Sequence, residues 1–148
     1  MMARPLRPPP DMPSPELVAT LYPWVRPAHI VLVCISVALF AARGLGVLAG
    51  RAWPRAAWAR HGSALIDTAL LAAGATLWWL LQLNPLQGDG WLGLKLVLLI
   101  VYIVLGSFAL KRAPTRAGKA GFFAAALACI GFMANIAMAR HPLGGLAP

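Results

Sequence analysis

The chain has 148 residues, of which 60% are hydrophobic and only 11% are charged. A soluble domain has about 45–50% apolar residues even with glycine included, and about 25% charged residues. The composition therefore excludes an ordinary soluble fold, a disordered chain, a coiled coil and a disulfide-stabilised scaffold. The net charge of +9 comes from 13 basic and only four acidic residues, and these charges lie between long apolar runs.

The first 27 residues are rich in proline and carry charges of both signs. Because proline lacks an N–H group and has a fixed φ angle, this segment is predicted to be an extended, flexible leader. The uninterrupted apolar run at residues 30–42 also resembles a secretory signal peptide, since several arginines precede it. The run resumes after Arg43 and no clear small-residue cleavage site follows, so a retained helix is the favoured interpretation.

Four apolar stretches are long enough to cross a bilayer, at residues 28–49, 62–83, 91–110 and 120–139. The hydrocarbon core is about 30 Å thick, and an α-helix crosses it with about 20 residues. The gaps between the stretches are so short that they permit only tight antiparallel connections. The prediction is an all-α protein, a four-helix transmembrane bundle with up-down topology over residues 28–142, followed by a short tail at residues 143–148.

Most basic residues outside the stretches gather in two of the three loops, on the same side of the bilayer. They are Arg51, Arg55, Arg60, Lys111, Arg112, Arg116 and Lys119. The third loop, at residues 84–90, carries Asp89 and no basic residue. Because short loops rich in Lys and Arg stay on the cytoplasmic side, the pattern predicts that both termini lie outside the cytoplasm. Contact with the lipid bilayer accounts for the net charge, and direct nucleic-acid binding is not expected.

Arg43 and Asp67 are charged residues inside predicted spans, where each costs about 2.5–3.5 kcal/mol near the helix centre. Arg43 lies six residues before the end of the first span, and Asp67 lies five residues after the start of the second. In an antiparallel pair of helices the two side chains lie at similar depth, so an intramembrane ion pair between them is predicted. The pair would fix the register of the two helices, and a proton relay is the alternative interpretation.

A polar stripe is predicted on the first span, because His29, Ser36 and Arg43 recur at intervals of seven residues. Lys95 and Tyr102 lie on another narrow face of the third span. His29 and Lys95 fall at a similar shallow depth near the outer surface, so the cofactor-binding candidates are His29, Lys95 and Tyr102. A neutral His29 and a desolvated Lys95 could bind an anionic group, or His29 could coordinate a haem iron. The alternative is that Lys95 only anchors its helix at the interface.

No catalytic or metal site is predicted. Cys34 and Cys129 lie inside apolar runs, where a thiol behaves as a small hydrophobic group. His61 falls on the opposite side of the bilayer from His29 and His141. A haem held by His29 and His141 is geometrically conceivable, although His141 follows the last span and precedes Pro142. On the fourth span the small residues are predicted to let backbones approach closely, either inward within the bundle or between copies of the chain. These small residues, with one amide, are Gly121, Ala124, Ala128, Gly131 and Asn135.

Motifs on all four spans resemble the SirB family of bacterial membrane proteins. The motifs are His29 with Ser36, Phe40, Arg43 and Gly44; Asp67-Thr68-Ala69-Leu70-Leu71; Asn84-Pro85 with Trp91-Leu92-Gly93-Leu94-Lys95 and Tyr102-Ile103-Val104-Leu105-Gly106; and residues 132–142. The resemblance covers residues 24–142 approximately. The family often has further histidines at the positions of Pro27 and Ala64, and their absence here weakens the case for haem.

The family takes its name from the up-regulation of invasion gene expression, so the resemblance implies a regulatory protein of the bacterial inner membrane, with both termini then in the periplasm. Loops this short argue for an indirect effect through another membrane protein, and a homo-oligomer remains open. The placement of His29 and Lys95 is also similar to the HemJ type of protoporphyrinogen oxidase. Two hypotheses remain: a non-enzymatic accessory or regulatory protein, and a membrane oxidoreductase that binds haem, a porphyrin or a quinone at His29 and Lys95.

Overall fold

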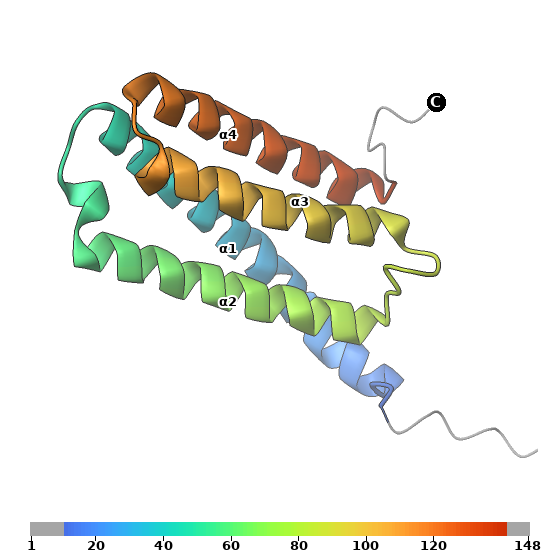
Figure 1. The fold of residues 1–148 in the computed structure, drawn as a ribbon. Coiled ribbons are helices and arrows are strands. Elements are labelled where there is room, and N and C mark those ends of the chain that lie inside the picture. The colour runs from blue at the N-terminus through green and yellow to red at the C-terminus, as the bar shows by residue number, and fades with distance from the viewer. Residues whose placement is uncertain (1–10, 142–148) are drawn as a thin grey trace, which may run out of the picture.

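The computed structural model describes residues 11–141 of the chain, and in that range it is helical without strands. The helices are α1 (Pro15–Leu48), α2 (Ala57–Leu81), α3 (Gly90–Ser107) and α4 (Arg116–Ala139), with a 3₁₀ turn η1 (Trp53–Arg55) after α1 and a π-helical turn η2 (Phe108–Arg112) after α3. Four helical segments are long and apolar enough to cross a membrane, η2 counting with α3. The predicted four-helix bundle is confirmed (Figure 1). The predicted tail at residues 143–148 lies outside the described residues.

α1 begins thirteen residues before the first predicted span. The Ser14 hydroxyl accepts a hydrogen bond from the Leu17 N–H at 3.2 Å, and Pro15 occupies the first helical position, where no N–H is needed. Glu16 follows in the first turn, where the helix dipole favours a negative charge. The predicted flexible leader is therefore wrong for residues 15–27, because these start signals outweigh Pro23 and Pro27, which lie inside the helix.

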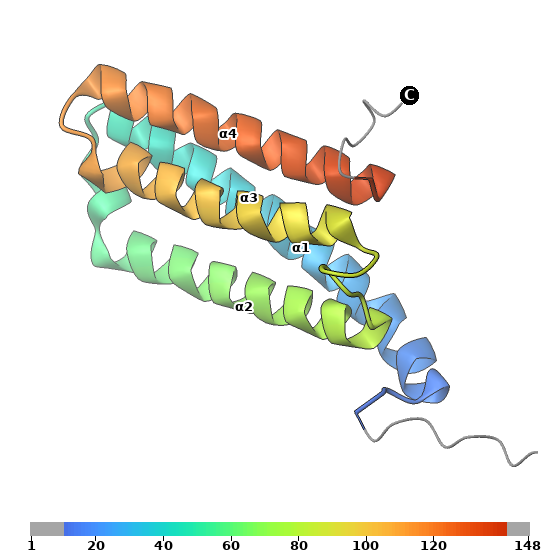
Figure 2. The same ribbon diagram turned by 45° about the vertical axis from the view of Figure 1, so that its right-hand side comes forward.

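The four helices form two antiparallel pairs. α1 packs along α2, and α3 packs along α4; α1 joins the pairs through its contacts with α4 and η2. α2 and α3 are connected by a short loop at residues 82–89, yet they scarcely contact each other. Figures 1 and 2 both show them apart. The bundle is therefore open on one side, between α2 and α3.

The shared core lies in the half of the bundle away from the start of α1. Phe40 of α1 packs against Phe123 of α4 and Tyr102 of α3, with ring centroids 5.4 Å apart in both pairs. A Cβ atom at Gly44 would overlap the Phe123 ring, so this close approach of α1 and α4 requires a glycine. Ala109 and Ala126 complete the buried cluster.

α4 faces the core with its larger side chains. Phe123, Ala126 and Ile136 are its buried residues. The predicted inward packing of the small-residue stripe is wrong, because most of that stripe is exposed; the exposed members are Gly121, Ala124, Ala128 and Gly131. The glycine that permits close helix approach lies on α1 instead, and a phenylalanine of α4 fills the space beside it.

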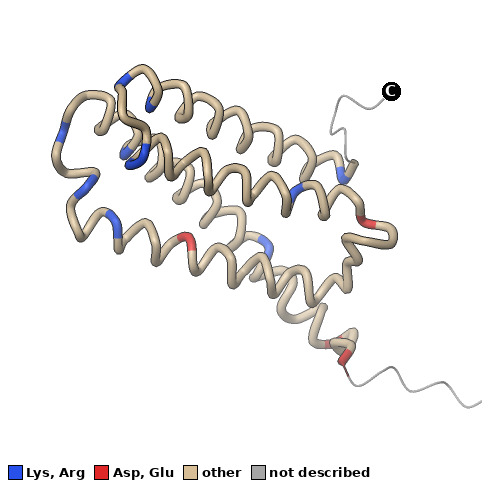
Figure 3. The backbone as a smooth tube through the Cα atoms, viewed as in Figure 1, with Lys and Arg blue, Asp and Glu red and all other residues tan. Residues whose placement is uncertain are grey.

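One end of the bundle is strongly basic (Figure 3). η1, the first turns of α2, η2 and the start of α4 lie at this end, together with all seven basic loop residues predicted to share one side. Residues 49–61 and 108–119 contain no Asp or Glu. Asp89 lies in the loop at the opposite end. The charge separation between the two ends is therefore a property of the folded bundle.

Candidate functional site

The polar stripe of α1 forms its seam with α2. The Ser36 hydroxyl donates a hydrogen bond to Asp67 Oδ1 at 2.5 Å. Seven residues earlier, the His29 ring lies against Gly74, where a Cβ atom would be 3.2 Å from the ring. A step of seven residues along α1 is thus matched by a step of seven back along α2, as antiparallel packing requires. The predicted stripe is confirmed, and it faces α2.

The predicted direct ion pair between Arg43 and Asp67 is not formed. Arg43 donates from Nε and Nη2 to the carbonyl oxygen of Pro54, at 3.2 and 3.1 Å, while Asp67 accepts from Ser36. The reason is the turn η1, because Pro54 is buried against Gly46 and its carbonyl takes the guanidinium. The charges of Arg43 and Asp67 still interact across the space between them.

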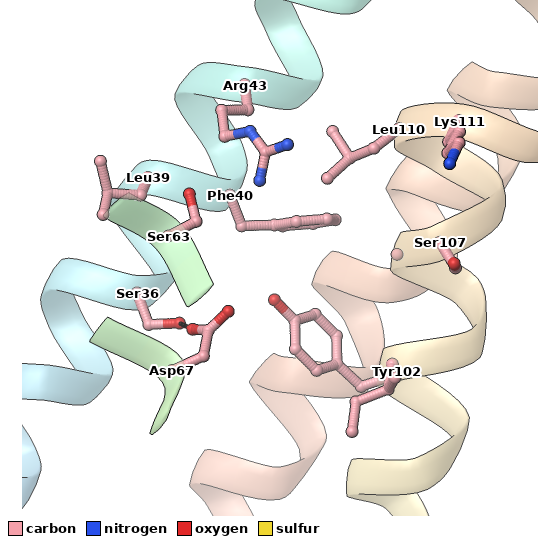
Figure 4. Close-up of a pocket in the computed structure, with 12 residues that line it drawn as sticks. Ser36, Leu39, Phe40, Arg43, Ser63, Asp67, Tyr102, Ser107, Leu110 and Lys111 are labelled. Carbon is pink, nitrogen blue, oxygen red and sulfur yellow. Dashed lines mark hydrogen bonds between the residues drawn. The ribbon is translucent and has the colours of Figure 1, made fainter. Parts of the chain in front are cut away.

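That space is a cavity of about 290 Å³ between α1, α2 and the end of α3 (Figure 4). Its lining residues are Ser36, Leu39, Phe40, Arg43, Ser63, Asp67, Tyr102, Ile103, Gly106, Ser107, Leu110 and Lys111. The volume is near the lower limit for small-molecule sites, which run from about 300 to 1,000 Å³. Because α2 and α3 scarcely contact each other, the cavity lies at the open side of the bundle.

The positively charged and negatively charged groups of the cavity lie on different sides of it. Figure 4 shows the Arg43 guanidinium entering from one side and the Asp67 carboxylate on the other, with the Tyr102 hydroxyl pointing toward Asp67. Lys111 lies on the wall formed by the end of α3, at the same level as Arg43 toward the basic end, with Leu110 drawn between them, and its side chain is exposed. The Ser63 Oγ atom is buried without a hydrogen-bond partner. The cavity therefore offers cationic donors at one side and an anionic acceptor at the other.

The π-helical turn η2 brings Lys111 to the cavity wall. Its wider turn is closed by the Ala113 N–H, which donates to the Phe108 carbonyl at 3.0 Å. In a continued α-helix, position 111 would rotate away from the face that holds Tyr102 and Gly106. Sequence analysis assigned Lys111 only to the basic loop, because no residue pattern predicts a π turn.

Sequence analysis also missed Ser63 and Ser107 as lining residues. Ser63 precedes Asp67 by four residues, so the helical period alone could have placed the two on one face. Ser107 follows Tyr102 by five residues, a spacing that does not single it out.

His29 and Lys95 lie outside this cavity, toward the other end of the bundle. The Nδ1 atom of His29 is buried without a hydrogen-bond partner, and the ring interacts electrostatically with Lys95 and with the Leu70 backbone. His29 and Lys95 are therefore close enough to interact electrostatically, whereas Tyr102 lies beside Asp67. The three residues predicted as one cofactor-binding set are divided between two places.

The two thiols of the described residues differ in their surroundings, because Cys34 is exposed and Cys129 is half-buried. Cys34 and Cys129 are free, and the Cys129 Sγ donates to the Leu98 carbonyl of α3 at 3.3 Å. Within residues 11–141, no group of three His, Cys, Asp or Glu side chains is placed to hold a metal ion.

The fold and the site together define a multi-pass helical membrane protein with a polar cavity inside its bundle. Residues 22–142 match the family model described as "Invasion gene expression up-regulator, SirB". The chain belongs to the SirB family, which confirms the resemblance seen in the motifs.

Relatives in enteric bacteria cover most of the chain. It is 37% identical over 120 residues to Protein SirB2 of Salmonella typhimurium, an alignment that spans 79% of this chain and 93% of the relative. Protein SirB2 of Salmonella typhi gives the same identity and coverage. Protein YchQ of Escherichia coli K12 is 30% identical over 128 residues, with 79% of this chain and 92% of the relative aligned. No solved structure matches the chain.

Proposed function

We propose that this chain is a regulatory or accessory protein of the inner membrane that acts through a membrane partner bound at its basic end. The family description, an up-regulator of invasion gene expression, supports a regulatory role. The helices take up most of the described residues, and the connections at the basic end are too short to form a DNA-binding domain. The effect on gene expression is therefore indirect.

The observation that carries the proposal is the concentration of seven basic side chains, without an acid, on the short segments of one end. Short loops of this composition are usually retained in the cytoplasm, which supports a periplasmic position for both termini. A basic surface at the cytoplasmic side attracts an acidic partner, and it also lies against anionic lipid headgroups. Partner binding and lipid attraction must therefore be separated by experiment.

The test is crosslinking in cells with a charge-reversed variant. Arg55 and Arg112 are exposed at the basic end, and Arg55→Glu with Arg112→Glu is expected to abolish the crosslinked partner while the protein remains inserted. Arg26→Glu, on the exposed surface of α1 far from that end, is the matched control and retains the partner. Unchanged crosslinking in the double variant would overturn the proposed docking surface.

The second candidate function is the membrane oxidoreductase with His29 and Lys95 at its centre. It is favoured by one observation, the buried His29 Nδ1 atom, which forms no hydrogen bond of ideal geometry although the ring lies near the Leu70 backbone and interacts with the charge of Lys95. A buried histidine nitrogen with hydrogen-bonding capacity left over is a suitable ligand for a haem iron.

An absorption spectrum of the purified protein, oxidised and then reduced with dithionite, tests the haem version of this candidate. A stoichiometric Soret band that is lost in His29→Ala would favour the oxidoreductase. A featureless spectrum from well-folded protein, produced with adequate haem supply, would remove haem binding and leave the regulatory proposal in place.

A further inference from the structure

The cavity beside Asp67 has opposite charges at its two sides. Asp67 accepts from Ser36 through Oδ1, and Figure 4 shows its other oxygen directed toward the cavity and Tyr102. Arg43 and Lys111 lie on the opposite side, nearer the basic end. A ligand that matches this arrangement carries a negative group and a positive group on one short framework.

Two polar groups on the Arg43 side have unused hydrogen-bonding capacity. The Ser63 hydroxyl is buried without a partner, which costs free energy until an acceptor reaches it. Arg43 uses Nε and Nη2 on Pro54, and a guanidinium has five N–H groups in all. An anionic ligand oxygen on this side therefore satisfies donors that the protein leaves open.

The side opening of the cavity indicates where the ligand comes from. α2 and α3 scarcely contact each other there, and Asp67 is exposed between them although α2 is a membrane-spanning helix. The walls beside the polar groups include Leu39, Ile103 and Leu110. A molecule with a polar head and apolar chains can enter from the bilayer and leave its chains in the lipid.

We propose that this cavity binds a phosphoethanolamine group, with the phosphate toward Arg43 and Lys111 and the primary ammonium toward Asp67 and Tyr102. The cavity of about 290 Å³ holds roughly ten water-sized volumes, enough for this group of about eight non-hydrogen atoms. The source that fits the side opening is a phospholipid whose acyl chains pass between α2 and α3. Lys111 belongs both to the cavity and to the basic end, but binding in the cavity does not require a partner docked at that end.

Hydrogen bonding distinguishes this headgroup from the other common ones. A primary ammonium donates to a carboxylate and to a phenol oxygen in charge-assisted bonds. A choline headgroup has no N–H group, and a glycerol headgroup has no positive charge. The cavity is therefore expected to prefer phosphatidylethanolamine to phosphatidylcholine and to phosphatidylglycerol.

Native mass spectrometry of the full chain in micelles with equal amounts of these three lipids tests the preference. We expect one bound phosphatidylethanolamine, retained over phosphatidylglycerol by about tenfold, as a charge-assisted bond allows. The isosteric Asp67→Asn variant is expected to reduce the preference to about twofold or less. Glu16→Gln, which removes a carboxylate outside the cavity, is the matched control and keeps the full preference. Equal retention of the lipids by the native chain, or an unchanged preference in Asp67→Asn, would overturn the proposal.

A second pair of variants covers the case in which Asp67→Asn does not insert. Tyr102→Phe removes one acceptor of the ammonium and is expected to lower the preference severalfold, whereas Tyr22→Phe, on the other tyrosine of the chain, leaves it unchanged. An identical effect of both substitutions would contradict the assigned site.

Soluble phosphoethanolamine distinguishes the two sources of the headgroup. Displacement of the bound lipid by millimolar phosphoethanolamine supports recognition of the headgroup alone, whether free or lipid-borne. Retention of phosphatidylethanolamine in its presence, combined with loss in Asp67→Asn, supports the lipid as the ligand. Displacement by inorganic phosphate to the same extent would overturn the role of the ammonium.

Discussion

Asp67 lies between hydroxyl groups that come from two different helices. Ser36 of α1 donates to it, and the Tyr102 hydroxyl of α3 points toward it. Ser63 lies one turn away on α2 with a buried hydroxyl that has no partner. Ser36 is therefore expected to stabilise the fold, and the unpartnered hydroxyl of Ser63 is expected to destabilise it.

Replacement of each serine by alanine tests this contrast. Ser36→Ala leaves the carboxylate without its donor and is expected to lower the free energy of unfolding by about 1 kcal/mol, the scale of hydrogen bonds between membrane helices. Ser63→Ala removes an unsatisfied buried hydroxyl and is expected to be neutral or stabilising in lipid-free micelles. Unfolding by titration with a denaturing detergent measures both. Equal destabilisation by the two substitutions would contradict the hydrogen-bond assignment.

The sequence predicted the residues at this site better than their contacts. The seven-residue interval placed His29, Ser36 and Arg43 on one face, and the span ends placed Asp67 near Arg43 in depth. The pairing was wrong because it depends on where η1 directs the Pro54 carbonyl, and a two-helix argument has no information about that turn. Lys111 was missed for a similar reason, since the π turn arises from packing.

At the scale of helices, capping groups determine where α1 and α4 begin, and hydropathy only locates their middles. The Thr115 hydroxyl accepts from the Gly118 N–H at 3.0 Å, so α4 begins at Arg116, four residues before its predicted span. Ser14 acts in the same way for α1. Both signals were present in the sequence, but a bilayer-length criterion does not detect polar starts.

Gly44 is the position at which α1 and α4 depend on each other. A Cβ atom there would overlap the Phe123 ring, so Gly44→Ala is expected to lower the free energy of unfolding by about 1–3 kcal/mol through overpacking. Gly121→Ala is the matched control, because no atom lies near enough to meet its Cβ, and helix propensity favours alanine there. The same detergent titration compares the two variants.

A double variant separates overpacking from backbone effects at Gly44. Phe123→Leu in the Gly44→Ala background provides room for the new methyl group and is expected to recover part of the lost stability. If the double variant is as unstable as the sum of its single variants predicts, the contact between Gly44 and Phe123 does not limit the packing of α1 against α4.

For the whole molecule, the pairing of the helices determines where the bundle is open, and the connectivity of the helices determines at which end the basic loops lie. Within residues 11–141 the two helix pairs meet mainly along α1 and therefore leave the side between α2 and α3 open, which no hydropathy pattern predicts. The basic end, in contrast, was predicted in full, because up-down topology fixes which loops share a side once four spans are recognised. The up-down topology can be predicted once the four apolar spans are recognised in the sequence, whereas the opening between α2 and α3 depends on side-chain packing.

Orientation in the membrane is expected to depend on the charge difference between the two ends. Replacement of Lys111, Arg112, Arg116 and Lys119 by Gln, with Gln87→Lys in the opposite loop, removes much of that difference and is expected to produce molecules of both orientations. Alkaline phosphatase, which is active only in the periplasm, reports the change when it is inserted within the full-length chain after residue 87 or after residue 115. In the native chain we expect activity at residue 87 and none at residue 115, and in the variant activity at both.

Gln substitutions at Arg26 and Arg140 leave the loops of the basic end intact and are expected to preserve the native pattern. Activity only at residue 115 in the native chain would reverse the proposed orientation and place the basic end, with any partner that it binds, in the periplasm.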